Sequence, residues 1–168
     1  AIENEGLKPL AGEFERIAAI KTPADVVAVI AHQHALIANP LFQFFVDQDA
    51  KSTTDVIAQI QQGGLGMPDR DYYTKEDDKS KEIRKEYVAH CAKMFQLLGD
   101  DAATAERNAG TVMSIETRLA NASMTLVQQR DPNATYNKMS LSELGGAAPG
   151  FDWNFYFAGI GKASPGPI

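Results

Sequence analysis

Apolar residues recur at three- and four-residue spacing along much of the chain, a pattern typical of helices that bury one face. Residues 7–21 show it first, and there it predicts a helix whose buried face consists of Leu7, Leu10, Phe14, Ile17 and Ala18. Residues 22–39 predict a second helix, which the Asn-Pro pair at 39–40 ends. Thr22 is placed to cap its N-terminus, and Pro23 fits the first helical position because the N–H it lacks needs no partner there.

The pattern changes to alternation with period two between residues 42 and 60. The apolar positions are Phe42, Phe44 and Val46 in the first run and Val56, Ala58 and Ile60 in the second. Asp, Ser and Thr residues fill the stretch between the two runs, as is common in turns. The sequence therefore predicts a small two-stranded β-hairpin.

Helical spacing returns in residues 75–100, which predict a long helix capped by Gly99, and in residues 101–124, which predict its partner in a helical hairpin. The expected inward positions are Ile83, Tyr87, Met94 and Leu98 in the first helix and Ala105, Val112, Leu119 and either Ile115 or Met113 in the second. Ser140 and Glu143 have the spacing of a capping box for a short helix, and residues 150–160 predict an aromatic-rich one. The fold class is therefore mainly α, with a small β-hairpin.

Composition excludes several classes of partner and of site. The chain has 168 residues and a formal net charge of −6, without a block rich in Lys or Arg, so nucleic acid is not an expected partner. No apolar run approaches the roughly 18 residues needed to span a bilayer, so no transmembrane segment is predicted. The single cysteine, Cys91, excludes an internal disulfide and a Cys-rich zinc site.

Several short patterns are compatible with chemistry, but none is sufficient for it. His32 and His34 form an H-x-H, yet on the predicted helix they lie roughly 200° apart and cannot share one metal ion. His90 and Cys91 are adjacent, and adjacent helical positions do not face each other, so they are not expected to form a nucleophile and base pair. The GGLG at 63–66 is not followed by the Gly-Lys-Ser/Thr of a phosphate-binding loop.

The connection "QQGGLGMPDRDYYTKED", Gln61 to Asp77, is too specific for a loop that only has to be solvated. Its glycines indicate a turn that needs positive φ or a close backbone approach. The "DRDYY" cluster predicts a pinned loop, with the Arg70 guanidinium on a carboxylate or on carbonyls of the turn and with Tyr72 and Tyr73 packed beside it. This is the chemistry of a scaffold, because no general acid, nucleophile or metal-ligand set is present.

Several segments of the sequence, including this connection, resemble those of a known family. "QGGLGMPDRDYY", "IRKEYVAHCAKMFQLLGD", "ETRLANAS", "RDPNATYNKMSLSEL" and "FDWNFY" occur in this order. Together they closely resemble the N-terminal region of the zinc metallopeptidase family that includes neprilysin, endothelin-converting enzyme and bacterial oligopeptidases. The resemblance covers nearly the whole chain.

The resemblance implies a catalytic domain with H-E-x-x-H and a downstream E-x-x-x-D around zinc, and neither motif occurs here. It implies that residues 1–168 are a single fragment of the N-terminal helical lid domain, from which the catalytic zinc domain is absent. The parent would hydrolyse small peptides, and the fragment would restrict substrate size. We therefore assign no catalytic, cofactor-binding or metal residue to this chain, and we expect it to bind no zinc. Its expected partners are the missing catalytic domain and, through the parent, small peptide substrates.

The alternative is a stand-alone interaction module without peptidase activity. The start at Ala1 without methionine and the Gly- and Pro-containing tail "GIGKASPGPI" favour a truncated fragment. The compartment stays open, although a periplasmic, secreted or membrane-anchored parent is favoured over a cytoplasmic one by the resemblance. Asn121 and Asn133 begin Asn-x-Ser/Thr triplets, which matter only in a eukaryotic secretory pathway.

Overall fold

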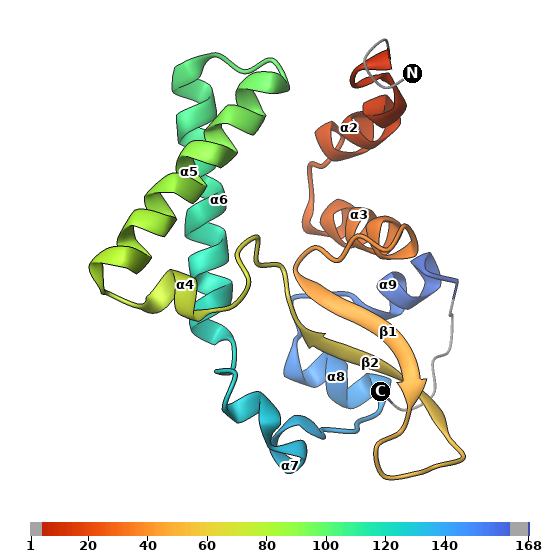
Figure 1. The fold of residues 1–168 in the computed structure, drawn as a ribbon. Helices are drawn as coiled ribbons and strands as arrows, with labels where there is room; N and C mark the ends of the chain where they lie inside the picture. Colours follow the sequence, from red (N-terminus) through yellow and green to blue (C-terminus); the bar gives the residue numbers. More distant parts are fainter. Residues whose placement is uncertain (1–4, 162–167) are drawn as a thin grey trace. The chain divides into compact units, whose positions relative to one another are not determined.

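The structure is a computed structural model that describes residues 5–161 and residue 168. Figure 1 shows the path of the chain. The elements are η1 (Lys8–Leu10), α2 (Ala11–Ala18), α3 (Pro23–Ala35), β1 (Phe42–Gln48), β2 (Val56–Gln62), α4 (Asp71–Thr74), α5 (Asp78–Leu97), α6 (Ala102–Ala122), η2 (Gln128–Arg130), α7 (Pro132–Thr135), α8 (Leu141–Ala147) and α9 (Trp153–Gly159). The prediction of a mainly helical fold with one antiparallel two-stranded hairpin is confirmed. None of the described helices is both long and apolar enough to cross a membrane.

The chain divides into two compact units. Unit 1 consists of residues 1–61 and 136–168, and unit 2 consists of residues 62–135. Each unit has a hydrophobic cluster of its own. Unit 2 is therefore an excursion in the chain between the two segments that build unit 1.

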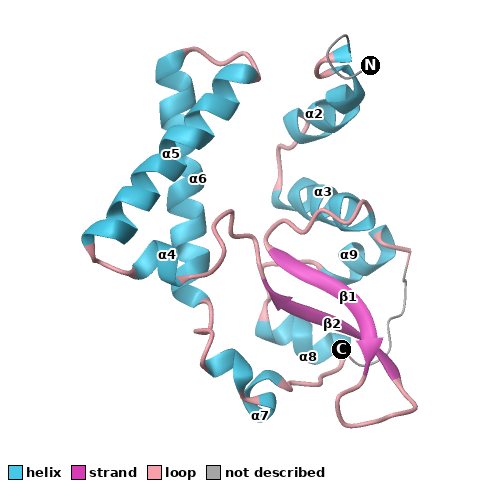
Figure 2. Ribbon diagram, viewed as in Figure 1, coloured by secondary structure: helices cyan, strands magenta, loops and turns pink. Residues whose placement is uncertain are grey.

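The core of unit 1 brings together α3, the hairpin and α9 (Figure 2). Its buried members are Val27, Ile30, Ala31, Phe42, Trp153, Tyr156, Phe157 and Ile168. The side chains of Tyr156 and Phe157 are fully buried, and both rings make edge contacts with Phe44 of β1. The aromatic-rich helix predicted near the C-terminus thus supplies the largest fully buried side chains of this core.

Helix α3 begins as the sequence predicts. The Thr22 hydroxyl accepts a hydrogen bond from the backbone N–H of Asp25, and the Asp25 carboxylate accepts one from the backbone N–H of Thr22, which completes a capping box. The helix ends at Ala35, before the predicted Asn-Pro stop. Ile37 then adopts a left-handed φ of 64°, an unusual conformation for a β-branched residue.

The predicted buried face of the first helix is wrong for the described chain. Leu7 and Ile17 are each 44% exposed, Leu10 is 49% exposed and Phe14 is 36% exposed, while Ala18 is also exposed. The apolar spacing does produce the helical segment formed by η1 and α2. No element among the described residues covers its apolar side, because spacing alone encodes a one-sided helix and says nothing about what lies against it.

Unit 2 is built on the predicted helical hairpin of α5 and α6, which lie side by side (Figure 1). Asp77 and Asp101 cap the two helices, and Gly99 between them has a φ of 110°. The fully buried Ala105, Ala109 and Ala120 let the helices approach closely.

Two details of the α5–α6 hairpin differ from the predicted inward positions. Met113 packs in the cluster of unit 2, whereas Ile115, the other candidate at that place, is 51% exposed. Met94 and Leu98, expected to face inward, are 47% and 43% exposed. The larger apolar side chains of this hairpin are therefore packed mainly at the end near α4, whereas Ala105 and Ala109 make the buried contacts toward the other end.

Candidate functional site

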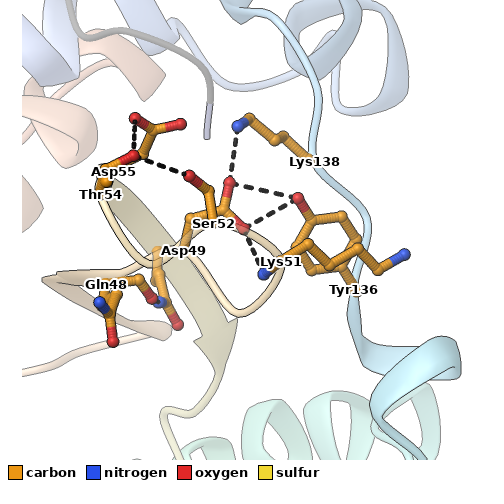
Figure 3. Close-up of polar contacts among 9 residues, drawn as sticks. Gln48, Asp49, Lys51, Ser52, Thr54, Asp55, Tyr136 and Lys138 are labelled. Carbon is orange, nitrogen blue, oxygen red and sulfur yellow. Dashed lines mark hydrogen bonds and ion pairs between the residues drawn. The ribbon is translucent and has the colours of Figure 1, made fainter.

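A buried carboxylate at the turn of the β-hairpin is the centre of a polar cluster in unit 1. The Asp49 side chain is only 1% exposed. Its oxygens accept hydrogen bonds from the Lys138 ammonium at 2.6 Å, from the Tyr136 hydroxyl at 2.9 Å and from the backbone N–H of Lys51 at 2.8 Å. Figure 3 shows the Tyr136 and Lys138 side chains pointing toward the Asp49 carboxylate.

Electrostatics fix the charge states in this cluster. The Lys138 hydrogen bond and the Lys51 N–H hold the pKa of Asp49 at about 2. Asp49 in turn raises the pKa of Lys138, and desolvation together with Asp49 raises the pKa of Tyr136. At neutral pH Asp49 is thus an anion, Lys138 a cation and Tyr136 a neutral phenol, and the last two donate hydrogen bonds to the first. It can fasten the hairpin turn to residues 136–138.

A second carboxylate, which is partly buried, organises unit 2. The Tyr73 hydroxyl of α4 donates to one oxygen of Glu116 at 2.6 Å, and the Tyr87 hydroxyl of α5 donates to the other at 3.0 Å. The Tyr73 oxygen also accepts the backbone N–H of Met67 at 2.9 Å. Glu116 of α6 therefore joins the glycine-rich loop, α4 and α5 at one point.

Both tyrosines of this network act as permanent donors. Burial raises the pKa of Tyr73 and of Tyr87, and the hydrogen bonds to Glu116 raise both further. Arg84 adds a second fastening, since its guanidinium donates to the carbonyls of Tyr72 and Lys75 at 3.0 and 2.7 Å. The arrangement pins the loop to the helical hairpin, as the sequence predicts.

The glycine-rich turn has both properties expected of it. Gly64 has a φ of 74°, in the left-handed region that favours glycine. A Cβ atom at Gly66 would lie 2.0 Å from the Tyr87 hydroxyl and 2.9 Å from the adjacent ring carbon. The loop backbone therefore passes directly over Tyr87, and a side chain at residue 66 would displace the tyrosine that donates to Glu116.

The role predicted for Arg70 is not observed. No described hydrogen bond or ion pair reaches its guanidinium, and its Nε atom is buried without a partner. Asp69 instead accepts the backbone N–H of Asp71 at 2.8 Å, which closes a local turn. The prediction for Arg70 rested on the general ability of a guanidinium to form paired hydrogen bonds, which does not show where the side chain lies. In the structure Tyr73, Tyr87 and Arg84 fasten the loop instead.

The histidines of the H-x-H do not meet. His32 Nε2 lies 2.9 Å from a carboxylate oxygen of Glu13 in α2. His34 is buried, with Nε2 at 3.0 Å from the Phe42 carbonyl and Nδ1 at 2.7 Å from the Tyr156 hydroxyl. A carbonyl can only accept, so Nε2 donates, and in the neutral ring Nδ1 accepts a hydrogen bond from the Tyr156 hydroxyl. Both ring nitrogens of His34 are therefore already occupied.

The described residues do not fit a zinc site. Within residues 5–161 and 168, no group of three or more His, Cys, Asp and Glu side chains is placed to hold a metal ion. His90 is exposed on α5, and Cys91 is half-buried one position further. The two histidines of α3 are committed to Glu13 and to the core. The assignment of no catalytic or cofactor-binding residue stays a prediction.

Sequence reasoning missed both carboxylates that organise the units. Asp49 resembled an ordinary turn residue, and its partners are 87 and 89 positions away. Glu116 carried a weak signal, because it is an acid between the cluster members Met113 and Ala120 on one face of α6. A carboxylate on an apolar helical face requires buried donors, and nearby tyrosines are the side chains that supply them.

The comparisons define the class. The sequence model of the N-terminal region of peptidase family M13 matches residues 1–167. The chain therefore belongs to peptidase family M13. Neprilysin-3 of Drosophila melanogaster is 33% identical over 119 residues, which are 71% of this chain and 15% of that protein. Endothelin-converting enzyme 1 of Bos taurus is 31% identical over 126 residues, which are 74% of this chain and 16% of that enzyme.

Solved structures carry the same fold. The zinc metalloprotease Zmp1 of Mycobacterium tuberculosis, in complex with an inhibitor, aligns with a TM-score of 0.89 and 27% identity over 95% of this chain and 24% of its own. PepO of Lactobacillus rhamnosis HN001 aligns with a TM-score of 0.77 at 17% identity, over 98% of this chain and 26% of its own. The chain thus spans about one seventh of the length of the curated relatives and about a quarter of these structures.

Substituting Gly66 by Ala tests the close approach in unit 2. Because the new Cβ would meet the Tyr87 hydroxyl, we expect a loss of about 1–3 kcal/mol in the free energy of unfolding, as for other overpacked sites. Gly110→Ala is the matched control: nothing lies within 4 Å of its Cβ position in α6, so it should stabilise unit 2 by about 0.5–1 kcal/mol. Urea unfolding followed by circular dichroism measures both. Equal effects of the two changes would contradict the packing described.

Substituting Asp49 by Asn tests the carboxylate of unit 1. The pKa of Asp49 is lowered from 3.8 to about 2, so its contribution to stability is present above pH 3.8 and is lost as the pH falls toward 2. We expect the variant to unfold at lower urea than the parent chain at pH 5, with a difference that shrinks at pH 3. Trp153 fluorescence reports unit 1, and Asp47→Asn, at an exposed position of β1, should unfold like the parent chain. A constant difference at both pH values would contradict the charge assignment.

His34 predicts a second pH dependence, with its own window. Burial lowers the pKa of His34, so the neutral ring stabilises unit 1 above the ordinary value of 6.5, and this contribution is lost as the pH falls below it. The free energy of unfolding, read from Trp153 fluorescence, should fall between pH 7 and pH 5 with a limiting slope of about 1.4 kcal/mol per pH unit. His34→Gln should flatten this slope, whereas His90→Gln, on the surface of α5, should leave it unchanged. An identical slope in all three proteins would refute the role of His34.

Proposed function

We propose that this chain is part of a zinc-dependent metalloendopeptidase that hydrolyses small peptides. In this proposal it supplies the helical lid domain that covers the active-site cavity and restricts substrate size. The observation that carries the proposal is the match of the M13 family over residues 1–167. Relatives named as an endothelin-converting enzyme and as a zinc metalloprotease support the peptidase assignment.

The chemistry of the described residues supports a role as scaffold. The carboxylates of Asp49 and Glu116 are saturated by donors from their own units. His34 uses both ring nitrogens within the core. Because the residues that the structure describes do not fit zinc, we place the metal and the catalytic groups in the part of the parent that lies outside residues 1–168.

The role as a size filter requires a rigid body, and unit 2 has the properties of one. Its two long helices are capped at their N-termini, packed through buried alanines and fastened to the glycine-rich loop through Glu116. A cover built in this way keeps its shape when a bulky chain presses against it, so peptides too large for the cavity would be excluded rather than accommodated.

A stand-alone interaction module is the second candidate. The exposed apolar side of η1 and α2 favours it, because exposed apolar surface of this kind marks a docking site. The two candidates differ in a direct way. A module would function as residues 1–168 alone, whereas a lid has no activity without the rest of the enzyme.

The test compares purified residues 1–168 with the full-length polypeptide that contains them. We expect one zinc per full-length molecule and hydrolysis of a short fluorogenic peptide that chelator abolishes, with no cleavage of an unfolded protein substrate such as reduced casein. Residues 1–168 alone should retain no zinc after dialysis and should hydrolyse nothing. A full-length polypeptide that is inactive and free of zinc would favour the interaction module, and cleavage of casein at the rate of the peptide would contradict the size filter.

A further inference from the structure

The helical segment of η1 and α2 has an apolar side that the described chain leaves uncovered. Leu7, Leu10, Phe14 and Ile17 follow one another at three- and four-residue spacing, and each is more than a third exposed. The orientation of α2 is nevertheless defined, because Glu13 of α2 lies 2.9 Å from His32 of α3. This side of the segment is a fixed apolar surface of unit 1.

A hollow continues this surface. Ile20 lies three positions after Ile17, just beyond the end of α2, and its backbone N–H donates to the Ile17 carbonyl at 3.2 Å. Ile20 also lines an open hollow of about 440 Å³, together with Val26, Val27, Ile30, Leu41 and Phe151. The wall is therefore mainly apolar, with Lys21 and Thr22 as the polar residues at its edge.

One residue that lines the hollow has an unfavourable backbone conformation. Leu41 has a φ of 69° and is 39% exposed. Ile37, four residues earlier in the chain and not part of the lining, has a φ of 64° and is 87% exposed. Large aliphatic residues seldom adopt positive φ, and strained residues of this kind cluster at functional places such as ligand clamps and switch regions. Here the strained residue Leu41 also exposes an apolar side chain, whose contact with water is unfavourable.

We infer that the apolar side of η1 and α2 and the adjoining hollow, together the α2 surface, form a docking surface for the part of the parent polypeptide outside residues 1–168. This inference rests on the proposed function, because it takes the missing part of the metallopeptidase as the occupant. The chain covers only 15–16% of its curated relatives and 24–26% of the solved ones, so most of the parent's length is available to cover the surface. A second copy is a poorer occupant, since each copy carries a net charge of −6.

Hydrogen exchange measured by mass spectrometry tests the α2 surface directly. Peptides that contain α2 are compared between residues 1–168 and the full-length polypeptide at several protein concentrations. We expect the α2 amides to exchange at least about tenfold more slowly in the full-length polypeptide, because docking suppresses local opening of the helix. Ile17→Glu should remove this difference, while Glu15→Gln, an exposed change on the same helix, should preserve it.

Two results overturn the inference. Equal exchange of α2 in the two proteins means that the missing part does not cover the surface. Protection that appears in residues 1–168 as concentration rises means that a second copy covers it. If Ile17→Glu prevents the full-length polypeptide from folding, the comparison of the two unsubstituted proteins still decides. Zinc content and peptide hydrolysis of the same full-length sample separate the two proposals: an inactive, zinc-free polypeptide with protected α2 would overturn the peptidase function alone.

Discussion

The fold of unit 1 depends on the burial of one charge. The Asp49 carboxylate is almost fully removed from water, and an isolated carboxylate in that position would be strongly destabilising. Lys138 and Tyr136, nearly 90 residues further along the chain, provide the cation and the donor that make its burial tolerable. The residues that neutralise Asp49 lead directly into α8 and α9, and α9 carries the aromatic side chains of the core. Neutralising Asp49 and completing the core are thus achieved by the same return of the chain.

Unit 2 also contains a carboxylate, here only partly buried, whose oxygens accept hydrogen bonds from residues of the same unit. Glu116 is held by two tyrosine hydroxyls, and one of these also accepts a backbone N–H from the glycine-rich loop. Gln62, at the start of the unit, exchanges two hydrogen bonds with the backbone of Met124 near its end. The ends of the excursion are therefore fastened to each other. In both units a carboxylate accepts hydrogen bonds from donors of its own unit, and this supports the proposed role of the chain as a scaffold.

The parts of the fold that the sequence predicts correctly are those set by local interactions. The capping box at Thr22, the alternation in the hairpin and the hairpin of α5 and α6 each depend on residues close in sequence. Asp49 and Glu116 were not predicted, since their partners lie 29 to 89 positions away and no local pattern marks them. The apolar side of α2 was predicted to be buried because apolar residues at helical spacing usually pack against another element. The spacing does not show whether that element lies within the same segment of chain. The close approach at Gly66 was predictable in kind from the glycine-rich turn, but the contact with Tyr87 was not.

The central claim is that residues 1–168 are the scaffold part of a zinc peptidase whose catalytic groups lie outside them. The most direct measurement is to sequence the parent reading frame beyond Ile168 and translate it. The account predicts H-E-x-x-H in that frame, followed downstream by E-x-x-x-D, which together supply two histidines and a glutamate for zinc and a glutamate as general base. A reading frame that reaches a stop codon soon after Ile168, or one that continues without these motifs, would contradict the central claim.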